Sequence, residues 1–222
     1  MPNPPTPDDA LLAGFERLST ALVSDILDGL GERDRVMRPG LSPVLADPLR
    51  VVAGRAYTVE VRATDEFVEI DRLLDMVDGT PTGSVVVVSS DRDIGAALWG
   101  GLVSAGTQAR GARAAVVDGA IRDQHQIAGL GFPVFAASRS PRDIRTRGEV
   151  VAVGEPLLCR GVLVANGDLV VADAVGVVVV AEAQAREVLT RCLERLELET
   201  ATERELLAGR GAADVYAHYG AF

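Results

Sequence analysis

Residues 84–123 read SVVVVSSDRDIGAALWGGLVSAGTQARGARAAVVDGAIRD, and this stretch decides the fold class. It opens with an uninterrupted β-branched run, SVVVVSS, which is typical of a strand buried on both faces. A glycine-punctuated segment follows, and its second half predicts a helix that begins near Gly100. The run ARAAVVDG at residues 112–119 predicts a second buried strand. A strand, a helix and a second strand in this order indicate an α/β fold.

Strand and helix patterns alternate on both sides of this stretch. We expect strands at residues 51–63 and 132–138, helices at 67–77 and 121–131, and almost continuous strand structure at 149–181. Mixed sheets are common where helices alternate with strands in one part of a chain and strands predominate in another. The pattern therefore predicts one α/β domain with a mixed sheet over the whole chain, residues 1–222.

Helical patterns occupy both ends of the chain. Two short helices are expected within residues 11–31, the second capped by Ser19 or Thr20. From about residue 183 to residue 222 we expect a long or broken charged helix and then a short one. The proline-rich residues 1–7 are expected to form a loose N-terminal arm.

Composition excludes several classes of protein. The net charge of −10 opposes non-specific nucleic-acid binding, because such binding depends on Lys and Arg meeting phosphates. No apolar run approaches the ~20 residues needed to cross a bilayer, and the N-terminus lacks a signal-peptide pattern. We therefore expect a cytoplasmic protein with no nucleic-acid or membrane partner.

The chain contains no lysine, which excludes a Schiff-base aldolase, pyridoxal phosphate chemistry and a P-loop.

The carboxyl ends of the two buried strands predict an anion site. Gly100 and Gly101 have no side chains, so a ligand can approach the backbone closely there. The N–H groups that open the next helix lack partners and carry partial positive charge, which suits a carboxylate or a phosphate. Arg122 offers a fork of donors for a carboxylate or an enolate oxygen, and Asp123 suits a hydrated divalent ion. Each piece alone also fits a structural role, as a turn or a helix cap.

The spacing of these residues resembles the signature of a known family. Gly101 is followed by twenty residues, then by Arg122 and Asp123, two further residues and Gln126. The pattern G-x20-R-D-x2-D/E is that of the RraA-like family. This family contains the regulator of ribonuclease activity A and the class II 4-hydroxy-4-methyl-2-oxoglutarate/4-carboxy-4-hydroxy-2-oxoadipate aldolases. Some of its members are labelled demethylmenaquinone methyltransferase. The resemblance extends to VSDILDGLG at 23–31, GFPVFA at 131–136 and NGDLVVADAVGVVVV at 166–180.

The resemblance implies a fold, an assembly and a role for each site residue. The fold would be an RraA-like α/β sandwich of the swivelling β/β/α type, and the assembly a homotrimer or hexamer. Arg122 would contact the carbonyl oxygen of a small 2-oxo acid of the pyruvate or oxaloacetate type. Asp123 would bind the divalent metal cation, Mg²⁺ or Mn²⁺. The backbone that binds the substrate carboxylate would be that of Gly100, Gly101, Leu102 and Val103.

The implied activity is that of a metal-dependent class II aldolase. It would cleave 4-hydroxy-4-methyl-2-oxoglutarate or a related acid through a pyruvate enolate, with oxaloacetate decarboxylation as a side activity. Gln126 departs from the family pattern, in which Asp or Glu helps to hold water on the metal. Gln126 can accept a hydrogen bond from such water, and so reach the metal through it, but it contributes no charge. This departure keeps a non-catalytic binding protein of the ribonuclease-regulator type as an alternative. A methyltransferase is disfavoured, because no acidic residue is placed to hold a ribose after the glycine loop.

Overall fold

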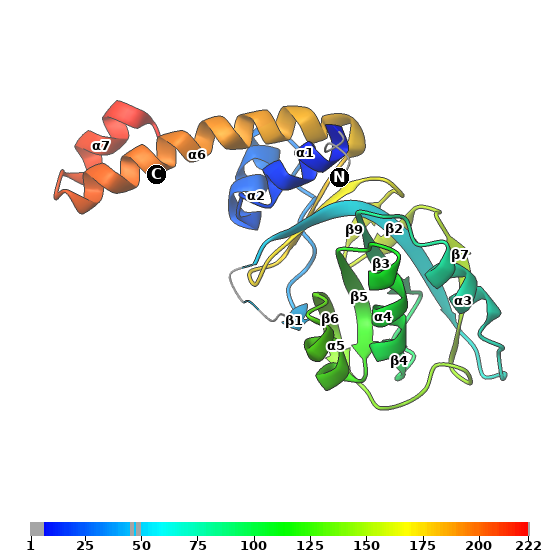
Figure 1. Cartoon of the computed structure of the whole chain (residues 1–222). Helices are drawn as coiled ribbons and strands as arrows, with labels where there is room; N and C mark the ends of the chain where they lie inside the picture. Colours follow the sequence, from blue (N-terminus) through cyan, green and yellow to red (C-terminus); the bar gives the residue numbers. More distant parts are fainter. Residues whose placement is uncertain (1–6, 45–46, 48–49, 222) are drawn as a thin grey trace, which may run out of the picture.

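A curled mixed sheet organises the chain, which a computed structural model describes at residues 7–44, 47 and 50–221 (Figure 1). The predicted N-terminal arm lies outside the described residues except for its last position, Pro7, which begins the first helix. The strands are β1 Ser42–Val44, β2 Val52–Ala63, β3 Ser84–Ser90, β4 Ala97–Trp99, β5 Ala114–Ile121, β6 Val134–Arg139, β7 Gly148–Val153, β8 Leu157–Cys159, β9 Val162–Val164, β10 Leu169–Ala172 and β11 Val177–Val180.

Helices flank this sheet and extend beyond it. Figure 1 shows α3, α4 and α5 together on one side and the long α6 running along another part of the molecule. The helices are α1 Pro7–Phe15, α2 Thr20–Gly29, α3 Asp71–Asp78, α4 Gly101–Ala109, α5 Gln124–Leu130, the short 3-10 helix η1 Glu182–Gln184, α6 Ala185–Leu207 and α7 Ala212–Tyr219.

The central strands are parallel and the outer strands are antiparallel. In the described part of the chain the strand order is β1-β6-β5-β3-β2-β10-β11, with β4 paired to β5 and β7 paired to β2. β3 lies between β2 and β5 and runs parallel to both. Its residues are buried from Ser84 to Ser89, which confirms the strand predicted from SVVVVSS. The strands β8 and β9 form a separate antiparallel hairpin.

Side chains that alternate along β3 enter two hydrophobic cores. Val86 and Val88 face the core beneath α3, α4 and α5. Val85 and Val87 face the opposite core, which the β8–β9 hairpin covers. Burial on both faces explains why this strand reads as a continuous β-branched run. A third core packs α1, α2 and α6 against β10 and β11, with Phe15 fully buried in it.

The second helix begins where a capping side chain is available. The Ser19 hydroxyl accepts a hydrogen bond from the N–H of Leu22 at 3.2 Å, so Ser19 and not Thr20 is the N-cap. The N–H and hydroxyl of Thr20 instead donate to the carboxylate of Asp173, at 2.9 and 2.8 Å. Asp173 thus ties the start of α2 to the turn between β10 and β11.

Several expected boundaries differ from those in the structure. β1 lies in a Pro- and Gly-rich stretch and is a strand because it pairs with β6. β5 extends to Ile121, so α5 begins at Gln124 and not at residue 121. The helix expected from residue 67 begins at Asp71.

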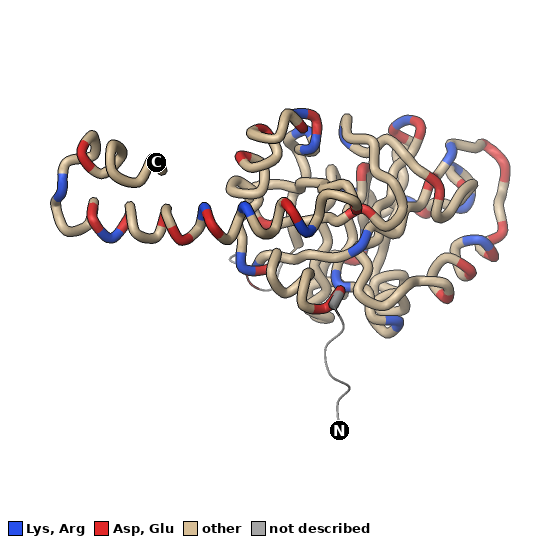
Figure 2. Tube along the Cα trace, turned by 90° about the horizontal axis from the view of Figure 1, so that it is seen from above, with Lys and Arg blue, Asp and Glu red and all other residues tan. Residues whose placement is uncertain are grey.

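The C-terminal helices extend away from the body of the molecule. α6 is one unbroken helix of 23 residues, and its second half projects together with α7 (Figures 1 and 2). Figure 2 shows acidic and basic residues alternating along this helix, which accounts for its charged sequence. Neither α6 nor any other helix in the described ranges combines the length and apolar character needed to span a membrane.

Candidate functional site

The residues singled out by the sequence meet at one edge of the sheet. β4 and β5 are parallel neighbours, with Trp99 opposite Ile121, so their carboxyl ends lie together. After Trp99 the chain passes through Gly100 into α4, and after Ile121 it passes through Arg122 and Asp123 into α5. The N–H of Arg122 donates to the carbonyl oxygen of Trp99 at 3.0 Å. This contact holds the two loops against each other, as the strand pattern predicts.

The two glycines are needed because space is short at the start of α4. Gly100 has an extended backbone, with φ −158° and ψ −176°, which any residue can adopt. A Cβ atom on Gly100 would lie only 3.0 Å from Asp123 Oδ2 and 3.2 Å from Arg122 Cγ. A Cβ on Gly101 would lie 2.9 Å from Gln126 Cγ and closer still to its amide. The glycine loop therefore packs directly against the three side chains of the predicted motif.

The start of α4 has backbone N–H groups without partners inside the helix. The first donor bonded within the helix is the N–H of Ser104, which bonds to the carbonyl of Gly100 at 3.0 Å. The three preceding N–H groups therefore lack a partner within the helix. The N–H of Gly101 donates to Asp123 Oδ2 at 3.2 Å, which leaves those of Leu102 and Val103 for a ligand. Leu102 is 79% exposed.

Asp123 has an unusual backbone conformation. Its φ of 57° and ψ of 36° lie in the left-handed region, which is uncommon for residues other than glycine. This conformation directs the carboxylate to the N–H of Gly101, and Oδ2 also lies 3.6 Å from Nε of Arg122. The side chain remains 43% exposed, so a ligand from solvent can reach it.

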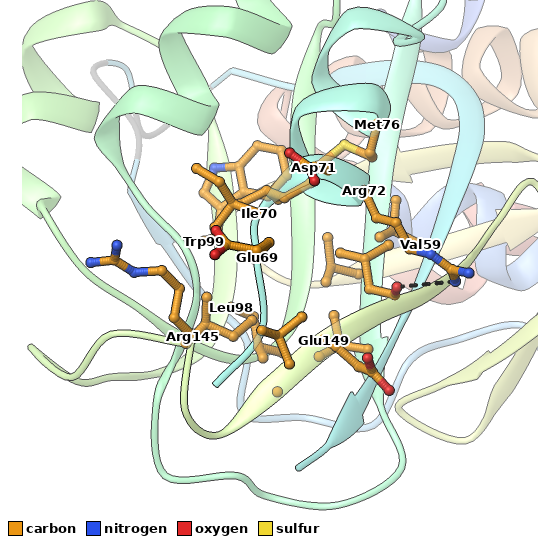
Figure 3. A pocket seen from close by; sticks show the side chains of 17 residues that line it. Val59, Glu69, Ile70, Asp71, Arg72, Met76, Leu98, Trp99, Arg145 and Glu149 are labelled. Carbon is orange, nitrogen blue, oxygen red and sulfur yellow. Dashed lines mark hydrogen bonds between the residues drawn. The ribbon is translucent and has the colours of Figure 1, made fainter. Parts of the chain in front are cut away.

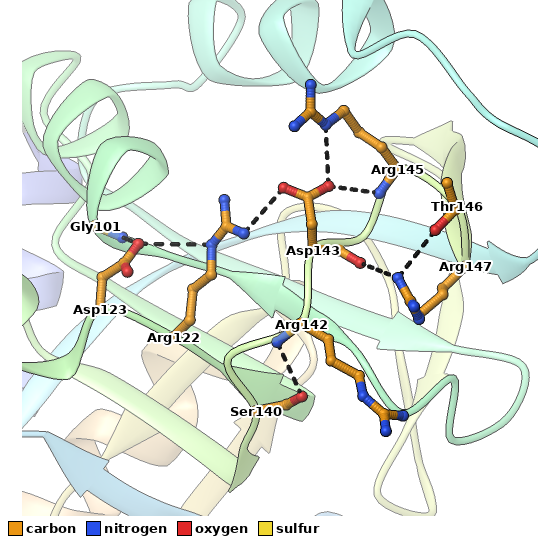
Figure 4. Close-up of polar contacts among 9 residues, drawn as sticks. All are labelled: Gly101, Arg122, Asp123, Ser140, Arg142, Asp143, Arg145, Thr146 and Arg147. Atoms are coloured by element: carbon orange, nitrogen blue, oxygen red, sulfur yellow. Dashed lines mark hydrogen bonds and ion pairs between the residues drawn. The ribbon is translucent and has the colours of Figure 1, made fainter.

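Arg122 lies between two carboxylates, one of which the sequence did not single out. Nη1 of Arg122 donates to Oδ2 of Asp143 at 2.9 Å, and Asp143 lies in the loop between β6 and β7 (Figure 4). The other oxygen of Asp143 accepts from the N–H of Arg145 at 2.8 Å and from its Nε at 3.0 Å. The N–H of Arg145, its guanidinium and that of Arg122 together lower the pKa of Asp143 to about 2.

The loop that carries Asp143 is strongly basic. Residues 139–147 read RSPRDIRTR and contain four arginines but one acid, in a chain whose net charge is −10. One of these arginines, Arg139, donates from Nε to Oε1 of Gln124 on α5 at 3.0 Å. The local positive charge offsets the repulsion that the whole chain exerts on an anion. A run of arginines around one Asp is thus the feature of the sequence by which this loop could have been identified.

The oxygen atoms available at the site as ligands suit a hydrated divalent ion. Within the described ranges no cluster of three or more His, Cys, Asp or Glu side chains has the arrangement of a metal cage. Asp123 supplies one exposed carboxylate, and Gln126 lies three residues further on, with its amide beside Gly101. Mg²⁺ commonly keeps several waters and binds to proteins through one or two carboxylates. Asp123 therefore suits such an ion, with water as its main additional ligand.

A small apolar cavity adjoins the site. Its volume is about 210 Å³, and Trp99 and Arg145 are among the residues that line it (Figure 3). Ile144 of the basic loop lines it as well. The remaining lining comes mainly from β2, from α3 with the residues just before it, and from β7. None of the predicted motif residues lines this cavity. Asp123 and Gln126 are exposed and Arg122 is partly exposed, whereas Gly100 and Gly101 are buried. Trp99 is buried, and its Nε1 donates to the Ser104 hydroxyl at 2.7 Å.

Other residues near the strand ends do not join the site. Asp118 pairs with Arg160 at 3.1 Å, beside the β8–β9 hairpin on the other face of the sheet. Asp91 accepts a hydrogen bond from the N–H of Ala63 at 3.1 Å. His125 is exposed on α5. The structure therefore gives these carboxylates structural partners and leaves His125 on the surface.

Known proteins resemble this chain in sequence and in fold. A model of the RraA-like family, described as Aldolase/RraA, matches residues 20–179. A protein of Halalkalibacterium halodurans named "Putative 4-hydroxy-4-methyl-2-oxoglutarate aldolase" is 31% identical over 192 residues, which cover 86% of each chain.

Two solved structures share the fold over nearly their whole length. A protein of Pseudomonas syringae pv. tomato superposes with a TM-score of 0.84 at 29% identity, covering 99% of both chains. RraAS2 of Streptomyces coelicolor, described as an unusual member of the RNase ES inhibitor RraA protein family, gives a TM-score of 0.78 at 26% identity. That match covers 91% of this chain and 99% of RraAS2. These likenesses extend across both the candidate site and the sheet that supports it.

Proposed function

Since this chain belongs to the RraA-like family, we propose that it is a divalent-metal-dependent class II aldolase. Its substrate would be 4-hydroxy-4-methyl-2-oxoglutarate or a related 4-hydroxy-2-oxo acid. One observation carries the proposal: the free N–H groups of α4, the Arg122 guanidinium and the Asp123 carboxylate lie beside one another. A 2-oxo acid has its carboxylate and its carbonyl on adjacent carbons. A site for it therefore needs an anion-binding site for the carboxylate and, directly beside it, a cationic hydrogen-bond donor for the carbonyl oxygen.

The backbone of α4 would bind and orient the substrate. Its carboxylate would accept hydrogen bonds from the N–H groups of Leu102 and Val103, where the helix also presents partial positive charge. The carbonyl oxygen would then point towards Arg122, which follows the adjacent strand. Because Gly100 and Gly101 have no side chains, the substrate can approach the backbone at this point.

Arg122 would stabilise the charge that forms during cleavage. A divalent ion held by Asp123 would supply a Lewis acid that polarises the substrate carbonyl. When the C3–C4 bond breaks, the C4 hydroxyl loses its proton to water and becomes the carbonyl of the second product. The electron pair of the broken bond forms the C2–C3 double bond of a pyruvate enolate, with the negative charge on the C2 oxygen, and a proton from water on C3 then gives pyruvate. Arg122 would donate hydrogen bonds to the C2 oxygen as its charge develops. Loss of CO₂ from oxaloacetate gives the same enolate, so we include oxaloacetate decarboxylation as a side activity.

The proposal includes an assembly and an effect of Gln126. We propose a homotrimer or hexamer, in which a neighbouring subunit would cover the open surface around the motif. Gln126 can accept a hydrogen bond but brings no charge, so metal affinity should be lower than with a carboxylate at this position.

A binding protein is the second candidate function. The neutral Gln126 and the likeness to RraAS2, described as a member of the RNase ES inhibitor RraA family, favour it. In that case the protein would have no metal-dependent lyase activity, and one of its surfaces would bind a partner.

Pyruvate release tests the proposal. The wild-type protein is assayed with 4-hydroxy-4-methyl-2-oxoglutarate and with oxaloacetate, in Mg²⁺, in Mn²⁺ and in EDTA. We expect metal-dependent turnover that falls by about 10²-fold or more in Arg122→Ala, as when a donor to a developing oxyanion is removed. Asp123→Ala should lose the metal dependence.

The matched control is Arg110→Ala, because Arg110 caps the other end of α4 and pairs with Asp78 on the surface. This variant should keep wild-type turnover. A folded wild-type protein that releases no pyruvate from either substrate with either metal would refute the aldolase proposal and favour the binding protein.

A further inference from the structure

We propose that Asp143 is a positioning residue that holds Arg122 away from Asp123. In this arrangement Arg122 faces the substrate and Asp123 stays available to a cation. The catalytic part of this inference rests on the proposed function, but the positioning itself is a property of the structure.

The two carboxylate oxygens of Asp143 accept hydrogen bonds from different arginines. Oδ2 accepts from Nη1 of Arg122 at 2.9 Å, while Oδ1 accepts from the N–H and the Nε of Arg145, at 2.8 and 3.0 Å. One oxygen is thus fixed by its own loop, and the other is directed at Arg122 (Figure 4). The carboxylate is a rigid link between that loop and the end of β5.

The loop itself is anchored on both sides of Asp143. The carbonyl oxygen of Asp143 accepts from Nη1 of Arg147 at 3.2 Å. The next residue, Ile144, packs against the hydrophobic core beneath α3 and α4. With a side chain that is only 34% exposed, Asp143 has little freedom to follow Arg122 if the arginine moves.

Asp143 and Asp123 compete for the same guanidinium. Nε of Arg122 lies 3.6 Å from Asp123 Oδ2, which is longer than a good hydrogen bond, whereas its bond to Asp143 is 2.9 Å. Arginine and a carboxylate readily form a two-bond pair when nothing prevents it. Without Asp143, Arg122 would close on Asp123, and each group would neutralise the other.

Crystal structures of variants test the positioning without any assay of activity. In Asp143→Asn the amide has one acceptor oxygen, so it cannot serve both Arg122 and the N–H of Arg145. We expect Arg122 to move onto Asp123 and to form hydrogen bonds shorter than about 3.2 Å. The matched control is Arg145→Gln, which keeps the backbone bond to Asp143 and should leave Arg122 in place. An unchanged Arg122 in Asp143→Asn would overturn the proposal.

A double-mutant cycle tests whether Asp143 acts through Arg122. The probe is oxalate, a planar dianion that resembles the pyruvate enolate, titrated calorimetrically in Mg²⁺. We expect Asp143→Asn to weaken oxalate binding about tenfold in the wild-type background, as for a misplaced binding group, and to have no further effect when combined with Arg122→Ala. Asp143→Glu, which restores two acceptor oxygens, should recover part of the affinity.

An equal loss in both backgrounds would show that Asp143 acts independently of Arg122 and would overturn the proposal. In steady-state kinetics Asp143→Asn should lower kcat more than it raises KM, and thermal unfolding identifies a variant that is merely unfolded. If the wild-type protein neither binds oxalate nor releases pyruvate, the proposed function fails, whereas the crystal structures still decide the role of Asp143.

Discussion

The substitution Gly100→Ala tests whether the glycine loop sets the geometry of the site. The extended backbone of Gly100 suits alanine, so the change introduces no backbone strain. Its whole effect comes from the new methyl group, which would lie 3.0 Å from Asp123 Oδ2 and 3.2 Å from Arg122 Cγ. Both distances are shorter than ordinary contacts between such atoms, so the two side chains must move by a few tenths of an ångström.

The expected magnitudes separate activity from stability. Overpacking at one methyl costs about 1 kcal/mol, and the reduced freedom of the unfolded chain offsets roughly half of this, so the net change in stability is small. A misplacement of about 1 Å costs on the order of 10²-fold in rate, so a shift of about half that size should lower kcat/KM about tenfold. A tenfold loss corresponds to about 1.4 kcal/mol in the activation barrier.

Pyruvate release and urea unfolding, measured on the same preparations, are the assays. Gly129→Ala is the matched control, because Gly129 lies on the neighbouring helix α5 and a Cβ there meets nothing within 4 Å. This control should keep its activity and gain up to about 1 kcal/mol from helix propensity. Full activity of Gly100→Ala, or an equal loss in Gly129→Ala, would refute the reasoning.

Three further predictions concern stability, protonation and metal affinity. Asp173→Ala leaves the buried Thr20 without its acceptor at 2.9 and 2.8 Å, and urea unfolding should show a loss of about 1–3 kcal/mol. A carbon-13 NMR titration should place the pKa of Asp143 near 2; a midpoint near 4 would contradict the observed contacts. Because this pKa lies below the usual 3.8, ionised Asp143 stabilises the fold fully above about pH 4, and the contribution is lost as the pH falls towards 2. Gln126→Glu restores a carboxylate beside Asp123 and should tighten Mg²⁺ binding about tenfold by calorimetry, whereas an unchanged affinity would show that this position does not reach the ion.

Local sequence determined the central elements and the meeting of the motif loops. The run SVVVVSS predicts a strand buried on both faces, and that strand lies at Ser84–Ser90. Parallel strands in an α/β sheet end at the same edge, so the loops that follow the predicted strands β3 and β5 were expected to meet. In the structure the unpredicted strand β4 leads the chain to Gly100, beside the end of β5. These features depend on residue periodicity and chain direction, both of which are present in the sequence.

Tertiary structure alone decided which groups surround Arg122. Asp143 lies 21 residues from Arg122, in a different loop, and no local pattern specifies that pair. The left-handed backbone of Asp123, which directs its carboxylate to the N–H of Gly101, is also invisible in the sequence. The three-residue strand β4 exists because β5 supplies its partners, since so short a segment has too little propensity of its own. Contacts between distant segments are set by how the loops pack after the sheet has formed. For that reason the sequence indicated the candidate site but not the carboxylate that pairs with Arg122.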